Sequence, residues 1–184
     1  MNNYQPTRII VGARGTQQRG WTTLEKSQLD ITRREDWQRL FAPGSLDAVL
    51  AEHVLEHLTP EQILQTLENA FIYLKPNGYF RIAVPDGFNP DKIYLENVRP
   101  GNVWNGDDHK VLLTIENLTP LLLRAGFTVN PLEFYDRNGR FYKQPFSHND
   151  GLIYRCFNGT WSKLTAWFIG CKNYTSLIVD AIKQ

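Results

Sequence analysis

The sequence predicts an open α/β fold, in which a mostly parallel twisted sheet has helices on both of its faces. The clearest observation is residues 46–86, which read as a strand, a helix and a second strand. The crossover is long enough for a right-handed parallel connection between the two strands. The second observation is a short apolar strand at residues 8–11 that ends in a glycine-containing turn. A chain of 184 residues suits one domain with a sizeable core, so we expect a single domain over residues 1–184.

The first quarter of the chain alternates short apolar runs with polar turns. After the strand at 8–11, residues 21–25 (WTTLE) read as a second strand. The nine residues between these strands leave little room for a crossover helix. Leu29–Ile31 read as the end of a third short strand, and residues 33–41 (RREDWQRLF) predict a short helix. The side chains of this helix that we expect to face inward are apolar: Trp37, Leu40 and Phe41.

The unit at 46–86 can be predicted element by element. Residues 46–51 form a nearly all-apolar run, as in a strand that is buried on both faces. Thr59 is a good N-cap for the following helix, and Gln62, three residues later, completes a capping box. The apolar spacing of that helix continues to Leu74, where Lys75-Pro76-Asn77-Gly78 stops it. A second strand then runs from Tyr79 to Val84.

Residues 87–109 are rich in Asn, Asp, Gly and Pro, with a helix expected within them at 91–98. A segment of this length with little regular pattern is usually functional, as a lid or a substrate loop. Residues 114–125 predict a helix that Gly126 ends, and residues 127–135 predict a strand.

The last quarter of the chain is less regular. Residues 136–149 read as a polar loop. The aromatic-rich stretches 151–157 and 161–170 fit either short strands or an irregular cover. Residues 174–182 (YTSLIVDAI) predict a final strand.

Composition excludes several classes of protein. The net charge of +1 gives no bulk attraction for nucleic acid or for an anionic membrane. No apolar run approaches the roughly 20 residues of a membrane helix, and the first residues, MNNYQPTR, lack the apolar core of a signal peptide. We expect Cys156 and Cys171 to be reduced thiols in a cytoplasmic protein.

Candidate binding residues follow the carboxyl ends of the predicted strands, which is where open α/β sheets bind ligands. The turn Gly12-Ala13-Arg14-Gly15 follows the first strand, and glycine there lets a nucleotide-like ligand approach the backbone closely. Glu25 ends the second strand, where a carboxylate can accept hydrogen bonds from both hydroxyls of a ribose. Glu52, His53 and Asp86 follow the two strands of the 46–86 unit.

Residues 53–57 also spell H-x-x-E-H, a pattern of zinc peptidases. On a helix, its two histidines would share one face and could share a metal ion. However, a buried strand ends directly before the motif, a new helix starts at Thr59-Pro60, and no third ligand is evident. We therefore expect no metal site and a structural His57, and we keep a zinc hydrolase as a minor alternative.

Several of these segments together resemble the class I S-adenosylmethionine-dependent methyltransferases. The shared features are a strand that ends in an acidic-His pair, a helix, and then LKPNGYFRIAVPD, with AGF before a later strand. The chain looks most like small bacterial members with a shortened first crossover, HVLEHL and a final SLIVDAIK. The resemblance implies a Rossmann-like methyltransferase fold whose last strand is antiparallel, with S-adenosylmethionine as the cofactor.

The resemblance also implies roles for single residues. The expected cofactor-binding residues are Gly12, Ala13, Arg14, Gly15, Glu25, Asp30, Ile31 and Glu52. Asp30 and Ile31 match the place that meets the adenine in this family, and Glu52-His53 lies beside the reactive methyl group. A hydroxyl acceptor would need a base, for which His53 and His109 are the candidates and Asp86 the third.

The acceptor itself is expected to be a small molecule or a saccharide, bound by the loops at 86–110 and 136–170. The small members that the chain resembles are linked to saccharide pathways, which favours a hydroxyl. Arg14 interrupts the usual glycine-x-glycine of the family. A non-catalytic member with a degenerate cofactor site therefore remains the main alternative.

Overall fold

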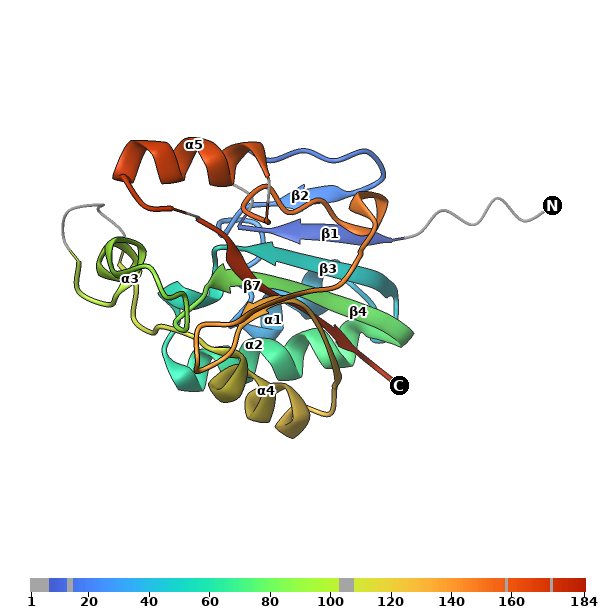
Figure 1. Cartoon of the computed structure of the whole chain (residues 1–184). Coiled ribbons are helices and arrows are strands. Elements are labelled where there is room, and N and C mark those ends of the chain that lie inside the picture. Colours follow the sequence, from blue (N-terminus) through green and yellow to red (C-terminus); the bar gives the residue numbers. More distant parts are fainter. Residues whose placement is uncertain (1–6, 13–14, 103–107, 158, 173) are drawn as a thin grey trace.

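The computed structural model describes residues 7–12, 15–102, 108–157, 159–172 and 174–184. Within these residues the chain forms a seven-stranded sheet in the order β2-β1-β3-β4-β7-β5-β6 (Figure 1). The strands are β1 (Arg8–Val11), β2 (Thr22–Leu24), β3 (Leu46–Glu52), β4 (Leu74–Pro85), β5 (Thr128–Tyr135), β6 (Phe141–Lys143) and β7 (Ser176–Ile182).

The sheet is mostly parallel with an antiparallel end. β2, β1, β3 and β4 are parallel neighbours, whereas β7 runs antiparallel to both β4 and β5. The edge strand β6 is antiparallel to β5. These pairings confirm the predicted open, mostly parallel sheet and the antiparallel placement of the strand at 174–182. The predicted strand at 127–135 is present as β5, and its register against β7 shifts between Pro131 and Glu133.

Helices cover one face of the sheet and the edge where its parallel strands end. The helices are α1 (Arg34–Leu40), α2 (Pro60–Tyr73), α3 (Lys92–Val98), α4 (Ile115–Arg124) and α5 (Thr160–Ile169). In Figure 1, α2 and α4 run along one face, and α3 lies beyond the carboxyl ends of the central strands. Thr59 and Gln62 form the predicted capping box, with both hydrogen bonds present.

The core lies on both faces of the central strands. Val49 and Ala51 of β3 belong to the large cluster under α1, α2 and α4. Leu50, between them, points to the opposite face, where it packs with Ile153 and Phe146 from an irregular covering segment. A strand buried on both faces was the prediction for residues 46–51, and the structure confirms it. Among the described residues, no helix is both long and apolar enough to span a membrane.

Two predictions for the first quarter of the chain are wrong. Leu29–Ile31 form no strand: Leu29 and Asp30 are irregular and Ile31 begins a turn, in which Asp30 Oδ1 accepts hydrogen bonds from the Thr32 amide (3.0 Å) and hydroxyl (2.7 Å). Leu40 is 37% exposed, although Trp37 on the same helix is buried. The α1 helix has only seven residues, and Trp37 alone provides its buried contact, stacking on Tyr73 at 5.5 Å.

Two further corrections concern the region after residue 136. The predicted polar loop contains β6, because Phe141 and Tyr142 pair across the strands with Tyr135 and Phe134 at ring distances of 4.9 Å. The stretch at 161–170 is neither strand nor irregular cover but the helix α5. Four of its large apolar side chains are exposed: Trp161, Leu164, Trp167 and Phe168.

Candidate functional site

A cavity of about 440 Å³ opens at the carboxyl ends of β1 and β3. Its walls come from the turn after β1, the end of β3 with the short helical turn that follows, and the segment before β7. The lining residues include Gly12, Gly15, Thr16, Glu52, His53, Glu56, His57, His109, Tyr154, Arg155, Trp161 and Tyr174. Five of the residues predicted from the sequence are therefore brought together here: Gly12, Gly15, Glu52, His53 and His109.

The glycine turn forms one wall because its backbone takes conformations that favour glycine. Gly12 has φ +61° and Gly15 has φ +84°, both in the left-handed region. A Cβ added at Gly12 would lie 2.8 Å from Cγ2 of Val54, so β1 and the end of β3 approach each other closely at this point. The predicted Ala13 and Arg14 lie outside the described residues.

Three other predicted cofactor-binding residues do not line the cavity. Glu25 lies next to it, since its Oε1 accepts a hydrogen bond from the amide of Gly15 at 3.2 Å. The carboxylate of Asp30 is occupied by the local turn at Thr32. Ile31 is buried in the large core cluster. The roles of these residues in binding a cofactor stay predictions.

Glu52 lines the cavity but its carboxylate already has partners within the protein. Oε1 accepts a hydrogen bond from the amide of Arg155 at 2.8 Å, and Oε2 accepts one from Tyr154 at 3.1 Å. These two bonds tie the covering segment to the end of β3. Glu52 therefore holds Tyr154 and Arg155 in the cavity wall.

His53 occupies a strained position directly after β3. Its φ is +55°, which is uncommon for a residue with a side chain and is frequent at functional sites. Its amide donates to the carbonyl of Ala83 at 2.8 Å. Nε2 lies 3.0 Å from Oγ of Ser176, and Nδ1 lies 3.0 Å from Oε1 of Glu56. The ring is thereby held between β7 and the turn after β3.

Asp86 lies outside the cavity and is fully buried. Oδ1 accepts a hydrogen bond from the amide of Phe88 at 2.9 Å, and Oδ2 accepts one from Tyr135 at 2.7 Å. Burial raises the pKa of Asp86 to about 6, against the opposing effect of these two hydrogen bonds. Its contacts tie the end of β4 to the end of β5, which is the work of a structural residue.

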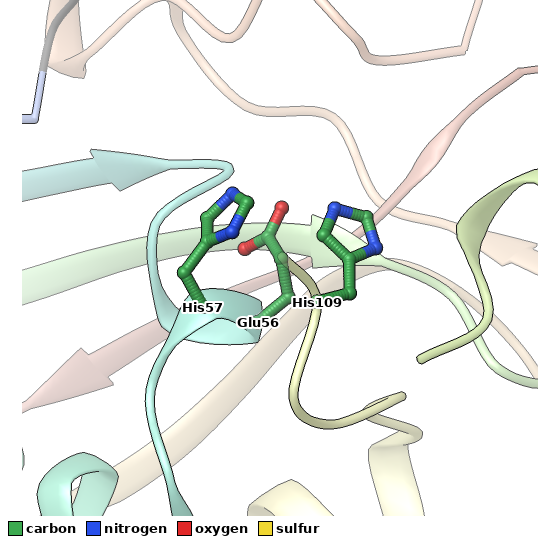
Figure 2. Close-up of side chains that lie close together, drawn as sticks. All are labelled: Glu56, His57 and His109. Atoms are coloured by element: carbon green, nitrogen blue, oxygen red, sulfur yellow. The ribbon is translucent and has the colours of Figure 1, made fainter. Parts of the chain in front are cut away.

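Sequence reasoning missed a cluster formed by Glu56, His57 and His109. Figure 2 shows the three side chains facing one another, and a ligand atom of each lies within 4.8 Å of the others. His109 comes from 52 residues further along the chain and is fixed there because the amide of Lys110 donates to the carbonyl of Glu56 at 2.8 Å. The H-x-x-E-H pattern was the available signal, but the third member could not be chosen from the sequence.

Glu56 is the buried anion of this cluster, with 1% of its surface exposed. Oε1 lies within ion-pair distance of His53 Nδ1, at 3.0 Å, but outside hydrogen-bond geometry. Among the described residues, neither carboxylate oxygen accepts a hydrogen bond. Burial favours the neutral form, yet His53 and His57 together hold the pKa of Glu56 below its ordinary value. The carboxylate is therefore charged at neutral pH.

Comparison with known proteins gives a consistent result. Residues 15–82 match a family model described as a methyltransferase domain. A highly reducing polyketide synthase, sorA, of Penicillium rubens is 28% identical over 134 residues, which are 71% of this chain. The chain spans only 5% of the length of that synthase.

Solved structures share the fold over almost the whole chain. A SAM-dependent methyltransferase from Archaeoglobus fulgidus has a TM-score of 0.57 at 15% identity, covering 97% of this chain and 86% of its own. Phosphoethanolamine N-methyltransferase 2 of Haemonchus contortus, in complex with S-adenosyl-L-methionine, has a TM-score of 0.52 at 14% identity. That match covers 97% of this chain and 49% of the other.

Proposed function

We propose that this chain is a class I S-adenosylmethionine-dependent methyltransferase that methylates a hydroxyl group of a small-molecule or saccharide acceptor, which the match of residues 15–82 to a methyltransferase domain and the shared fold support. Methyl transfer with S-adenosylmethionine as the cofactor follows from the family match and the fold. The hydroxyl acceptor is our proposal. The observation that carries it is the position of His53, a candidate base, in the same cavity as the glycine turn.

The residues of the cavity fit the cofactor. A volume of about 440 Å³ lies within the range of roughly 300–1,000 Å³ for small-molecule sites. A Cβ added at Gly12 would clash with Val54, so this position requires glycine. Because glycine has no side chain, a ligand would contact the backbone there. We assign Gly12 and Gly15 to the wall against the cofactor, and Glu25, beside Gly15, to its ribose. When bound, the cofactor supplies a methyl group activated by its sulfonium.

The protein's main contribution to methyl transfer is positioning. Holding the acceptor oxygen in line with the methyl group converts an encounter in solution into a step within one complex. This can lower the activation free energy by several kcal/mol. Glu52 supports this indirectly, since it holds Tyr154 and Arg155 in the cavity wall. Aromatic and guanidinium side chains there suit an acceptor that has both apolar and hydroxylated parts.

His53 is our candidate for the base that takes the proton of the acceptor hydroxyl. It lines the cavity, and its Nδ1 lies 3.0 Å from Oε1 of Glu56, a contact that orients the ring. His109 is the second candidate, since it lines the same cavity. Asp86 is not retained in this role, because both of its oxygens are engaged with backbone amides outside the cavity.

The first test is a calorimetric titration of the purified chain with S-adenosylmethionine and with its demethylated product. We expect one molecule of either ligand to bind per chain. If neither binds, the enzyme proposal fails; binding that appears only in Arg14→Gly would instead identify a non-catalytic member with a degenerate site. The acceptor is then sought by measuring the demethylated product formed with a panel of hydroxylated small molecules and saccharides. His53→Gln should lower the rate without lowering the affinity for the cofactor product.

We also place the protein in the cytoplasm. Cys156 and Cys171 are both buried thiols, which suits a reducing compartment. Fractionation of cells that express the full-length protein tests this assignment.

A further inference from the structure

We propose that Glu56, His57 and His109 form a binding site for one divalent transition-metal ion in the wall of the cavity (Figure 2). In the sequence, the H-x-x-E-H pattern lies between a buried strand and a new helix and has no evident third ligand. The fold provides that ligand from the segment after α3. His53, the first histidine of the pattern, is not part of the group and contacts Ser176 instead.

The three side chains are close enough to converge on an ion. Each offers one ligand atom, and these atoms lie within 4.8 Å of one another. Ligands at about 2.0–2.1 Å from a tetrahedral ion are roughly 3.3 Å apart. Closing by up to about 1.5 Å is within the reach of side-chain rotation, and His57, which is only partly buried, has room to rotate.

Glu56 provides the independent observation that points to a cation. Its carboxylate is buried, with 1% exposure, and in the part of the chain that the structure describes neither of its oxygens accepts a hydrogen bond. Buried charges are normally paired, hydrogen-bonded or bound to metal ions. His53 faces Oε1 only, and no salt bridge of the described residues involves Oε2. A metal ion between Glu56 and the two histidines would complete the pairing.

The two histidines are arranged as metal ligands usually are. His57 Nδ1 lies 3.2 Å from the carbonyl oxygen of Asp108, and His109 Nδ1 lies 2.8 Å from the carbonyl oxygen of Val98. A carbonyl oxygen can only accept, so each Nδ1 donates, and in a neutral imidazole of this tautomer Nε2 is the nitrogen that can coordinate a metal ion. Backbone carbonyls commonly orient metal-binding imidazoles in this way and fix their tautomer.

The ligand types select the class of ion. Two imidazole nitrogens and one carboxylate favour zinc or a neighbouring first-row ion, whereas magnesium and calcium prefer oxygen ligands. Three protein ligands leave a coordination position open, as in catalytic rather than structural sites. All three side chains line the cavity, so the open position faces the space for the acceptor.

A bound ion would restrict the methyl acceptor to molecules with an oxygen atom that can coordinate the ion. This statement about the acceptor rests on the proposed function. A hydroxyl that coordinates the ion loses its proton more readily, as zinc-bound water does. The proton passes to His53 or to solvent. The acceptor oxygen then forms its bond to the methyl carbon as the carbon–sulfur bond breaks, and the sulfonium becomes a neutral thioether.

The test is a calorimetric titration of the full chain with zinc after removal of metal by a chelator, with cobalt absorption as a second readout. We expect one zinc per chain, bound at least 100-fold more weakly by His57→Gln and by His109→Gln. His148 is the one of the four histidines that is neither in the cluster nor the candidate base, and His148→Gln should bind zinc as the wild type does. Circular dichroism checks that each variant folds, and His57, being partly exposed, is the variant least dependent on the core.

The outcomes separate the two proposals. No stoichiometric zinc in the wild type, or equal binding by the wild type and both cluster variants, would overturn the metal site. Zinc binding without binding of the demethylated cofactor product would leave the metal site standing and reject the methyltransferase proposal. The reverse result would reject the metal site alone. Titrating the cofactor product in the presence of the chelator keeps the two measurements independent.

Discussion

Gly12→Ala should be among the most damaging single-methyl changes in this protein, and Gly20→Ala is its matched control. Both glycines have positive φ, +61° and +80°. An alanine at either position costs about 1–2 kcal/mol for the left-handed backbone. At Gly12 the added Cβ would also lie 2.8 Å from Val54 Cγ2, whereas at Gly20 it would have no heavy atom of the described residues within 4 Å, apart from those of Gly20 and its two chain neighbours. Crowding of this kind adds about 1–3 kcal/mol.

We therefore expect Gly12→Ala to lower the free energy of unfolding by about 2–5 kcal/mol, and Gly20→Ala by about 1–2 kcal/mol. Urea unfolding measures both, with an unchanged m-value as evidence that the two-state comparison is valid. Calorimetry with the demethylated cofactor product should show weaker binding by Gly12→Ala alone, because the turn lines the cavity. Equal destabilisation of the two variants would show that Val54 moves aside, and the argument from close packing would be refuted.

Three other predictions concern carboxylates that accept hydrogen bonds within the fold. Glu52→Gln replaces an acceptor with an amide group that opposes a backbone N–H, so we expect a loss of about 1–3 kcal/mol and faster hydrogen exchange around residues 154–155, measured by mass spectrometry. Because burial raises the pKa of Asp86 from 3.8 to about 6, its contribution to stability is full below about pH 4, and up to about 3 kcal/mol of it is lost as the pH rises from about 4 through about 6. Asp86→Asn should remove this dependence in urea unfolding at several pH values. Arg81 donates to both oxygens of Asp180 at 2.7 Å, and Arg81→Leu leaves that buried carboxylate unpaired, so thermal unfolding should report a loss of about 3–5 kcal/mol.

Each of these has an outcome that would contradict it. Unchanged exchange around residues 154–155 in Glu52→Gln would mean that the covering segment does not depend on that carboxylate. A variant Asp86→Asn with the same pH profile as the wild type would assign the profile to other groups. If Arg81→Leu combined with Asp180→Leu is no more stable than Arg81→Leu alone, the loss does not come from an unpaired Asp180.

Much of the sheet could be predicted because its strands obey local rules. The apolar run of β3 is buried on both faces, and the caps at Thr59 and Thr114 fix where α2 and α4 begin. The missing strand at residues 29–31 shows the limit of such rules. An apolar residue on each side of Asp30 suggested a strand, but the side chain of Asp30 binds its own turn more readily than it joins a sheet.

The helix α5 was missed for a different physical reason. Its large apolar side chains do not form one buried stripe, since Trp167 and Phe168 are both 80% exposed. The pattern that normally reveals a helix is the burial of one face, and this helix does not bury its largest residues. The sequence predicts that a loop at 136–170 binds the acceptor. In the structure Trp161, which lies in the first turn of α5, lines the cavity.

The candidate site was predictable where it depends on strand ends and unpredictable where it depends on loops. Gly12, Glu52 and His53 meet because parallel strands end at one edge of the sheet. His109 reaches Glu56 through a path after α3 that no spacing rule gives. Glu52 lines the cavity at a strand end, but its hydrogen bonds to Tyr154 and Arg155 could be seen only in the tertiary structure.

The insertion of β7 between β4 and β5 has a consequence for synthesis of the protein. In the described part of the chain, β5 pairs with β6 on one side and with β7 on the other, so it reaches the parallel strands only through β7. The ribosome makes β5 and β6 first, and 40 residues separate the end of β5 from the start of β7. At about 5–20 residues per second, the open edges of β4 and β5 wait about 2–8 s for their shared partner. During that interval two unpaired strand edges are available to other chains, which makes the nascent protein a candidate for help from a chaperone.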